Sequence, residues 1–285
     1  MKPNELIQLS RLKEKDINDL IALSSKVGWN YDKQEIMTLL ASGKAYGYLT
    51  EEKKVIACAA IIPYGSILAS IGMVIVHPEY RGLGLARELV KTCMNQVSED
   101  TTFMLIATEE GRPVYEKLGF KKYSHVTRLF CPALKTDSAL SISEIKTMNK
   151  EDIQKVIEID KQAFGDSRHV FLENRIGQAI KALVIKNEYG TVDGYALLIQ
   201  QSSNLVIGPV VAKNDQHALQ LIQAIASNEK VGLRMDVLEG QDGIVSQLQK
   251  LGFQLVNQPP IMIKTEKPFP TRNHSLYAIA AQAYG

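Results

Sequence analysis

The chain has 285 residues, of which 45% are apolar and 22% charged, and its formal net charge is +2. At about 100–200 residues per domain, this length predicts two domains with ample apolar residues for their cores. A net charge so near zero argues against a nucleic-acid or membrane partner. Three cysteines without paired spacing predict neither a disulfide framework nor a zinc site, and residues 1–5 are too polar for a secretory signal. We therefore expect a cytoplasmic protein that binds no metal.

The first half of the chain predicts alternating strands and helices in the order β-α-α-β-β-β-α-β-α-β. In chain order we expect a strand at 6–9, helices at 13–26 and 32–41, a hairpin of 45–49 and 55–62, a strand at 67–76, a helix from a glycine loop to 97, a strand at 102–107, a helix around Tyr115 and a strand at 120–130.

One segment of this half, residues 55–76, carries no charge and is long enough to cross a bilayer. Its middle, residues 63–66, reads Pro-Tyr-Gly-Ser, which is typical of a turn. Strands covered on both faces also read as continuous apolar runs. The segment therefore predicts two adjacent buried strands and not a membrane span.

A glycine-bearing turn follows the strand at 67–76 and opens a helix. Gly82 and Gly84 place no Cβ between the backbone and a ligand, and the first amides of the helix have no partner within it. Such amides bind anions with the help of the helix dipole. The pattern predicts a pyrophosphate site, with an ordinary strand-to-helix turn as the alternative.

Spacing separates the nucleotide-binding families that use such turns. A dinucleotide fingerprint needs a third glycine where this chain has Arg87, and no Gly-Lys-Ser/Thr of a Walker loop is present. The pattern R-x-x-G-x-A formed by Arg81, Gly84 and Ala86 instead resembles the acyl-CoA loop of the GNAT superfamily of N-acyltransferases. The resemblance implies acetyl-CoA as the acyl donor, bound by Met73, Val74, Ile75, Val76, Arg81, Gly82, Leu83, Gly84, Leu85, Ala86, Arg87 and Thr108.

A second motif lies downstream, where Tyr115-x-Lys-x-Gly-Phe resembles the end of the GNAT motif. In that family the tyrosine lies beside the CoA sulfur and protonates the departing thiolate, which implies that Tyr115 is a general acid. The alternative is that Tyr115 only packs on the sheet. Many members carry Asn seven residues earlier, where this chain has Thr108, so the family's contact from Asn to pantetheine is in doubt.

The second half repeats the first at an offset of 133 residues, because 249–253 echoes 116–120. We expect a helix at 149–164 after a short strand, strands at 183–185, 195–200 and 205–211, and a helix at 218–225. The linker is 132–141. The fold class is therefore α/β, with mixed sheets in two tandem GNAT-like folds: a catalytic domain at 1–131 and a second domain at 141–285.

The copies differ where the chemistry is expected. Opposite the glycine loop, residues 213–218 contain no glycine and place Asp215 where an anion would bind, and Leu248 stands opposite Tyr115. The chain resembles bacterial two-domain GNAT proteins with a degenerate carboxy-terminal domain, through residues 163–168, 207–212 and 276–280. This resemblance implies a structural or acceptor-binding role for the second domain.

The acceptor side is less defined by sequence. In the fold that the resemblance implies, Trp29 and Tyr31 lie in the loop over the acceptor, where Trp29 either walls a pocket or anchors the loop. The candidates for the general base are Glu109, Glu110 and His77, and a water chain could also take this role. The alternative for Glu109 and Glu110 is that they only begin a helix, where the helix dipole favours acidic residues. Asp166 and Arg168 of the second domain either lie near a shared cleft or form a surface ion pair.

These observations favour an N-acyltransferase that moves an acetyl or short acyl group from CoA to a primary amine by direct attack. The acceptor is a small-molecule or peptide amine, and the chain is a monomer or homodimer. The alternative is an acetyl-CoA sensor without turnover. A nucleophilic hydrolase is disfavoured because no G-x-S-x-G motif is present.

Overall fold

The computed structural model describes residues 6–134 and 144–285, so the polar start at 1–5 and most of the predicted linker at 132–141 lie outside it. The helices are α1 (Ile17–Lys26), α2 (Lys33–Ser42), α3 (Leu85–Met94), α4 (Arg112–Lys117), α5 (Ile153–Phe164), α6 (His169–Gln178), α7 (Asp215–Ala226) and α8 (Asp242–Lys250). The strands are β1 (Gln8–Leu12), β2 (Lys44–Leu49), β3 (Val55–Tyr64), β4 (Leu68–Val76), β5 (Thr102–Ile106), β6 (Lys121–Cys131), β7 (Ile145–Thr147), β8 (Lys181–Lys186), β9 (Val192–Gln200), β10 (Leu205–Ala212), β11 (Leu233–Leu238), β12 (Gln254–Asn257), β13 (Pro260–Lys264) and β14 (Leu276–Ala278).

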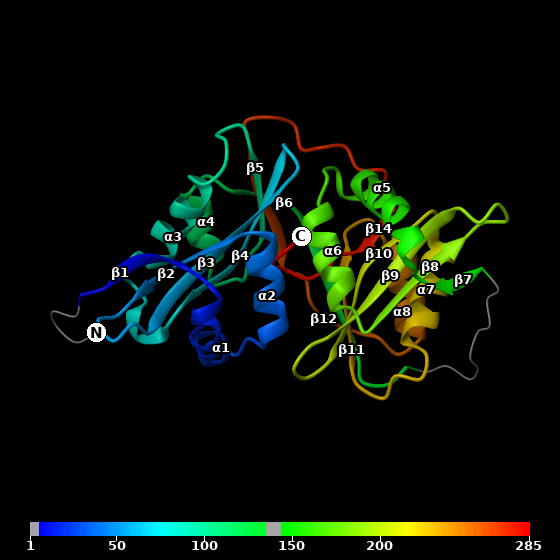
Figure 1. Ribbon diagram of the computed structural model, residues 1–285, viewed down its shortest axis with the longest axis horizontal. Helices are drawn as coiled ribbons and strands as arrows, with labels where there is room; N and C mark the ends of the chain where they lie inside the picture. The colour runs from blue at the N-terminus through cyan, green and yellow to red at the C-terminus, as the bar shows by residue number, and fades with distance from the viewer. Residues whose placement is uncertain (1–5, 135–143) are drawn as a thin grey trace.

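The two halves of the chain lie side by side and share one mixed sheet (Figure 1). Its strand order is β1-β2-β3-β4-β5-β13-β6-β11-β14-β10-β9-β8-β7, with β12 paired to β6. The predicted α/β class and the element order of the first half are confirmed. The predicted helix from the glycine loop to 97 ends earlier, at Met94, and the first strand is Gln8–Leu12.

The uncharged segment 55–76 forms β3 and β4, two antiparallel strands joined by a turn. Successive residues of β3 face opposite layers: Ala57, Ala59 and Ile61 pack with α3 and α4, whereas Cys58, Ala60 and Ile62 pack with α1 and α2. Burial on both faces explains the absence of charge. Among the described residues, no helix is long and apolar enough to cross a membrane.

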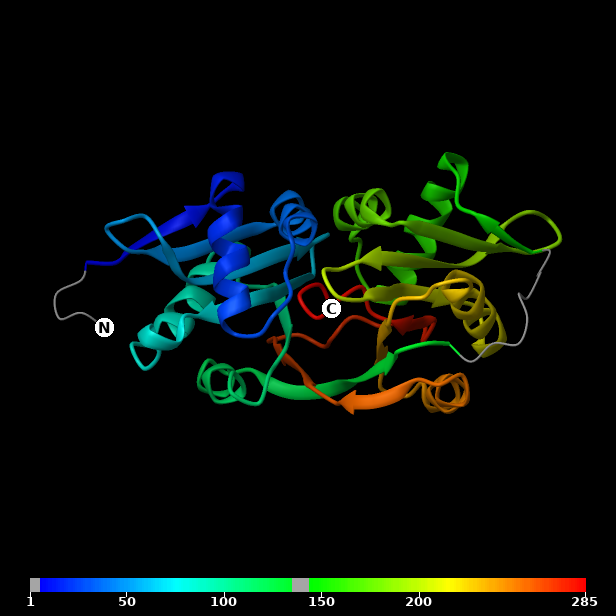
Figure 2. The same ribbon diagram turned by 90° about the horizontal axis from the view of Figure 1, so that it is seen from below.

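The halves exchange a strand that the sequence did not predict. β13, from the second half, lies between β5 and β6 of the first and pairs antiparallel with both. β6 in turn pairs with β11 and β12 of the second half, and Figure 2 shows it running from one half to the other. Each half therefore completes its sheet with a strand from the other.

The repeat at an offset of 133 residues is confirmed by matching helix ends. α4 is followed by Gly119 at φ 89° and α8 by Gly252 at φ 103°, both in the left-handed region that glycine adopts readily. The Phe120 amide donates to the Tyr115 carbonyl at 3.0 Å, and the Phe253 amide donates to the Leu248 carbonyl at 3.0 Å. Leu248 therefore occupies the position in the second half that Tyr115 occupies in the first.

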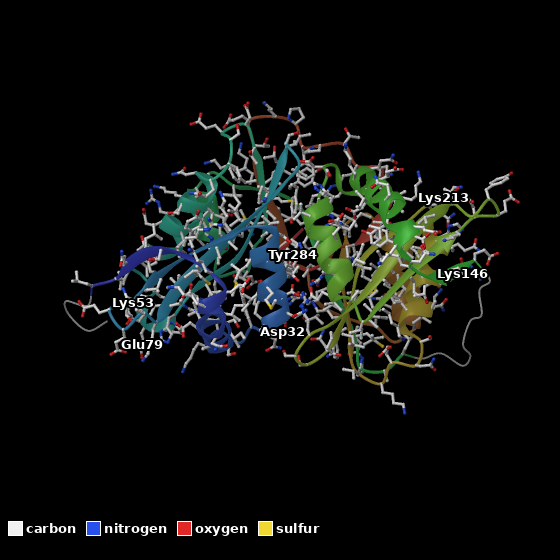
Figure 3. All side chains as sticks on the ribbon, viewed as in Figure 1. Asp32, Lys53, Glu79, Lys146, Lys213 and Tyr284 are labelled. Carbon is white, nitrogen blue, oxygen red and sulfur yellow. The ribbon has the colours of Figure 1, made fainter. Side chains whose placement is uncertain are left out.

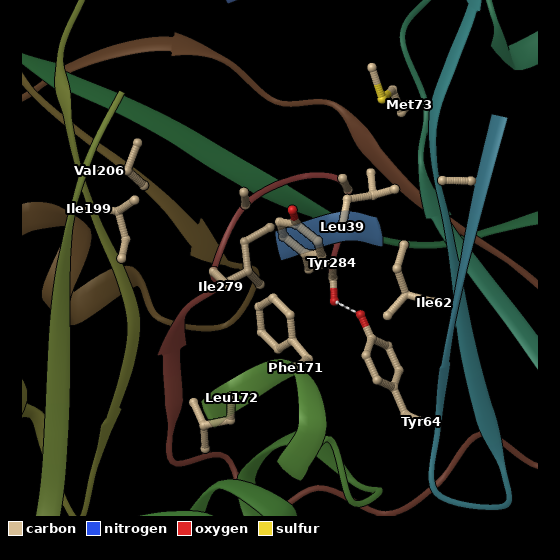
Figure 4. Packing of buried hydrophobic residues seen from close by; sticks show 14 of the residues in the cluster. Leu39, Ile62, Tyr64, Met73, Phe171, Leu172, Ile199, Val206, Ile279 and Tyr284 are labelled. Carbon is tan, nitrogen blue, oxygen red and sulfur yellow. Dashed lines mark hydrogen bonds between the residues drawn. The ribbon is translucent and has the colours of Figure 1, made fainter. Parts of the chain in front are cut away.

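A shared apolar core joins the halves through the segment 279–285, which lies between them (Figures 1 and 3). The Tyr64 hydroxyl donates to the Tyr284 carbonyl at 2.7 Å, as Figure 4 shows. The Phe171 ring lies 4.6 Å from the Tyr284 ring. Because these contacts join β3, α6 and the segment 279–285, they hold the two halves in one relative position.

Candidate active site

A cavity of about 1040 Å³ lies between the halves, at the point where β4 and β5 separate. The two strands pair only through residues 68–70 of β4, and farther along β4 Met73 takes a φ of 51°, which is unusual for a residue with a side chain. Residues 71–76 of β4 then line the cavity without a strand partner on the β5 side. The divergence leaves room for an extended ligand along β4.

The glycine loop lies at one end of this cavity. Gly82 and Gly84 take φ values of 81° and 78°, and a Cβ on either would meet no atom within 4 Å. Gly84 is the N-cap of α3, and no side chain caps that helix. The first amides of α3 are therefore available to an anion, with Arg81 and Arg87 beside them on the cavity wall. The loop fits a pyrophosphate.

Most of the predicted CoA contacts line the cavity. Of the twelve, Leu83 does not, and its side chain is 44% exposed beside the loop. Thr108 reaches the cavity wall, but its hydroxyl accepts a hydrogen bond from the Gly111 amide at 3.1 Å. Thr108 thus supports the turn into α4, whose six residues make a short helix.

Tyr115 reaches the same cavity from α4. Its side chain is buried against Phe120, with ring centroids 6.1 Å apart. Within residues 6–134 and 144–285, the Tyr115 hydroxyl makes no hydrogen bond. Burial raises the pKa of the Tyr115 phenol well above its ordinary value, so the group stays protonated at neutral pH. It can therefore donate a proton or a hydrogen bond to a ligand.

The other end of the cavity is built by both halves. Trp29 and Tyr31 line it, with ring centroids 6.2 Å apart, and the Asn30 amide donates to the Ser203 hydroxyl at 3.2 Å. The second half adds residues from β11, from the loop after β9 and from the segment 279–285. These cavity-lining residues are Gln201, Asn204, Arg234, Ala281, Gln282 and Ala283.

Glu35 of α2 also lines this end and was not predicted from sequence. Its carboxylate accepts from Arg175 of α6 at 2.6 Å and from the Gln178 amide at 3.2 Å. The Glu35 and Arg175 side chains are almost fully buried, so the ion pair ties α2 to α6 at the cavity wall. No local motif marks Glu35, because its partner is 140 residues away.

The candidate bases lie at the rim. Glu109 and Glu110 line the cavity but are exposed, and Glu110 pairs with Arg81 at 3.7 Å. His77 does not line the cavity, and its ring accepts from the Glu79 amide at 3.3 Å.

Asp166 and Arg168 neither line the cavity nor form a surface ion pair. Both are buried. Asp166 accepts from the Ile67 and Leu68 amides at 2.9 Å each, and Arg168 pairs with Asp160 at 2.8 Å. The prediction for these two residues was wrong, because Asp166 binds backbone amides almost 100 residues away and Arg168 is buried in an ion pair with Asp160 of α5.

The counterpart of the glycine loop in the second half is closed by its own side chains. Asn214 caps α7 by accepting from the His217 amide at 2.9 Å, and Asp215 accepts from the Tyr277 hydroxyl at 2.8 Å. A capped helix start beside a carboxylate does not suit an anion. No group of three or more metal-ligating side chains occurs within residues 6–134 and 144–285.

Comparisons with known proteins match both halves of the chain to one kind of domain. Acetyltransferase (GNAT) domain families match residues 28–128 and residues 156–278. The chain is 32% identical over 279 residues to the uncharacterized N-acetyltransferase YitH of Bacillus subtilis, with 98% of each chain covered.

Solved structures share the fold. A Pyrococcus horikoshii protein described as a candidate acetyltransferase superposes with a TM-score of 0.83 at 20% identity, covering 98% of this chain and 96% of its own. A tandem GNAT protein from the clavulanic acid biosynthesis pathway gives 0.67 at 15% identity, covering 93% and 100%. With a GNAT domain matched in each half and a relative similar over its full length, the chain belongs to the GNAT family as a tandem, acyl-CoA-dependent acetyltransferase.

Proposed function

We propose that the chain transfers an acetyl or short acyl group from acetyl-CoA to a primary amine by direct attack. The observation that carries this proposal is one cavity that is lined both by an uncapped glycine loop and by Tyr115. The glycine loop suits the pyrophosphate of CoA, and the Tyr115 phenol suits a thiolate that must be protonated as it leaves.

In the proposed reaction, the backbone amides of residues 85–87 and of the loop glycines bind the donor and take no part in the bond changes. The acceptor amine forms a bond to the thioester carbonyl carbon, and the carbon–sulfur bond then breaks. The Tyr115 phenol supplies the proton that the thiolate takes up, and its raised pKa keeps that proton in place until the step occurs. The acceptor amine loses its own proton to water or to a rim carboxylate, and a proton from water restores the Tyr115 phenol.

We further propose that residues 1–131 form the catalytic domain and that residues 141–285 serve as its acceptor-side wall. Support comes from Gln201, Asn204 and Arg234, which line the cavity from the second half. The capped α7 and Leu248 at the Tyr115 position support one donor site per chain.

The proposal is tested by a screen of primary amines with acetyl-CoA, read by release of free thiol and by the mass of the N-acetyl product. A reaction without amine measures hydrolysis. We expect at least one amine to raise thiol release well above hydrolysis. Tight acetyl-CoA binding without release for any amine would contradict the proposal and indicate a sensor.

A further inference from the structure

Two arginines lie on the cavity wall where the halves meet, one on β6 and one on β11. β11 reads Leu-Arg-Met-Asp-Val-Leu, so its charged residues Arg234 and Asp236 share one face while Leu233, Met235 and Val237 pack against the second-half core. Arg128 of β6 lies directly opposite Asp236 in the antiparallel register and therefore shares that face. Both arginines line the cavity.

The two guanidinium groups share a single carboxylate. The Arg128 Nε donates to Asp236 at 3.1 Å, and Arg234 donates to the same carboxylate through its Nε and one terminal nitrogen. Among the residues that the structure describes, Asp236 is the only carboxylate paired with either arginine. Asp236 is 1% exposed, whereas the arginine side chains are 23% and 20% exposed. The positive groups thus reach the cavity and the negative one does not.

Positive charge is in excess at this end of the cavity. Glu35, the other buried carboxylate there, is matched by Arg175 behind it. Three guanidinium groups, on Arg128, Arg175 and Arg234, are therefore balanced by two carboxylates. Burial lowers the pKa of Arg128, the Asp236 carboxylate raises this pKa, and the positive charge of Arg234 lowers it further. A partly buried cation in this setting is stabilised by a further anion.

The arginines belong to the acceptor end and not to the glycine loop. The charge of Arg234 acts on the Tyr31 hydroxyl, which lies in the loop between α1 and α2. The glycine loop has its own cations, Arg81 and Arg87. Both terminal nitrogens of Arg128 and one of Arg234 have no hydrogen-bond partner among the described residues. These donors are free to bind a ligand.

We propose that the acceptor carries an anionic group, a carboxylate or a phosphate, in addition to its amine, and that Arg128 and Arg234 bind this group. The inference rests on the proposed function, since it identifies the class of amine that the transferase would accept. Two guanidinium groups present parallel N–H donors that suit the paired oxygens of either anion. The second half, through Arg234, then contributes to acceptor selection.

The test uses matched probe pairs that share an amine and differ in the anionic group: β-alanine with propylamine, and O-phosphoethanolamine with ethanolamine. Calorimetry on the CoA-loaded protein measures binding without relying on turnover. Wild-type protein should bind at least one anionic probe roughly tenfold to a hundredfold more tightly than its partner, the range expected for charge-assisted hydrogen bonds. The pair that shows the preference separates a carboxylate from a phosphate.

Arg234→Gln should remove this preference while leaving CoA affinity within about twofold of wild type. Arg128→Gln is the second variant if the first does not fold, and a thermal unfolding curve checks each. Arg11→Gln, on the exposed face of β1, is the matched control and should change neither affinity.

Three binding results would overturn the inference. The anionic probes could bind no better than their partners, or Arg234→Gln could keep the preference. Arg234→Gln could also lose CoA affinity, which would place the arginines on the phosphates of the donor. If an anionic probe binds through Arg234 but no amine releases thiol from acetyl-CoA, the arginines form an anion site and the proposed function fails. If thiol is released equally from all four amines, the function stands and the inference fails.

Discussion

Substituting Gly84 tests the assignment of the loop, because this residue is the N-cap of α3 and lies beside the proposed anion site. At φ 78° a valine is strained, by roughly 1–2 kcal/mol for a residue with a Cβ in the left-handed region. The new methyls would occupy space that holds no protein atom within 4 Å of the Cβ, which is where the pyrophosphate is proposed to lie. We expect Gly84→Val to raise the acetyl-CoA dissociation constant at least tenfold, or about 1.4 kcal/mol.

Gly190 offers a matched control for the backbone strain. It has a φ of 77°, and a Cβ there would also meet nothing within 4 Å, but it lies in a loop of the second half that does not line the cavity. Gly84→Val and Gly190→Val should lower the melting temperature by similar amounts, whereas only Gly84→Val should weaken acetyl-CoA binding in calorimetry. Unchanged affinity in Gly84→Val, or equal loss in both variants, would refute the assignment of the loop.

Three further predictions concern stoichiometry, the junction of the halves and pH. The same calorimetry should give one acetyl-CoA per chain, and two equivalent sites would contradict a degenerate second copy. Asp166→Ala should lower the free energy of unfolding by about 2 kcal/mol or more, because it leaves three backbone amides without an acceptor, whereas Asp166→Asn should lower it less. Urea unfolding measures both variants, and equal values would contradict this role. Burial holds the pKa of several phenols above the value near 10 of the unfolded chain, so their contribution to stability is complete below pH 10 and falls as the pH rises above it. Ultraviolet titration should therefore show these tyrosines ionising only as the protein unfolds, and ionisation of all eleven near pH 10 in folded protein would contradict the burial of Tyr64, Tyr115 and Tyr284.

Local patterns predicted the elements of the first half, and the reasons are physical. The uncharged run at 55–76 is interrupted by a turn, which favoured two buried strands over a membrane span. Gly119, which takes a left-handed φ, marks the end of α4. The repeat likewise followed from the shared Lys-Leu-Gly-Phe, because the same helix end needs the same residues.

Features that depend on distant partners were not predicted. β13 is short and inserts between strands more than 120 residues earlier in the chain, so no local signal identifies its place. Glu35 becomes part of the site only through Arg175. The alternation of apolar and charged residues in β11 was a usable signal, since charges on every second residue of a buried strand predict a polar face.

The most direct test of the transferase mechanism is the turnover of Tyr115→Phe with acetyl-CoA and an amine found by the screen. The substitution removes one oxygen and leaves the ring beside Phe120. The account predicts that kcat falls roughly a hundredfold or more while acetyl-CoA affinity stays near that of wild type. An unchanged kcat would reject Tyr115 as the acid, and loss of binding together with activity would assign it a structural role.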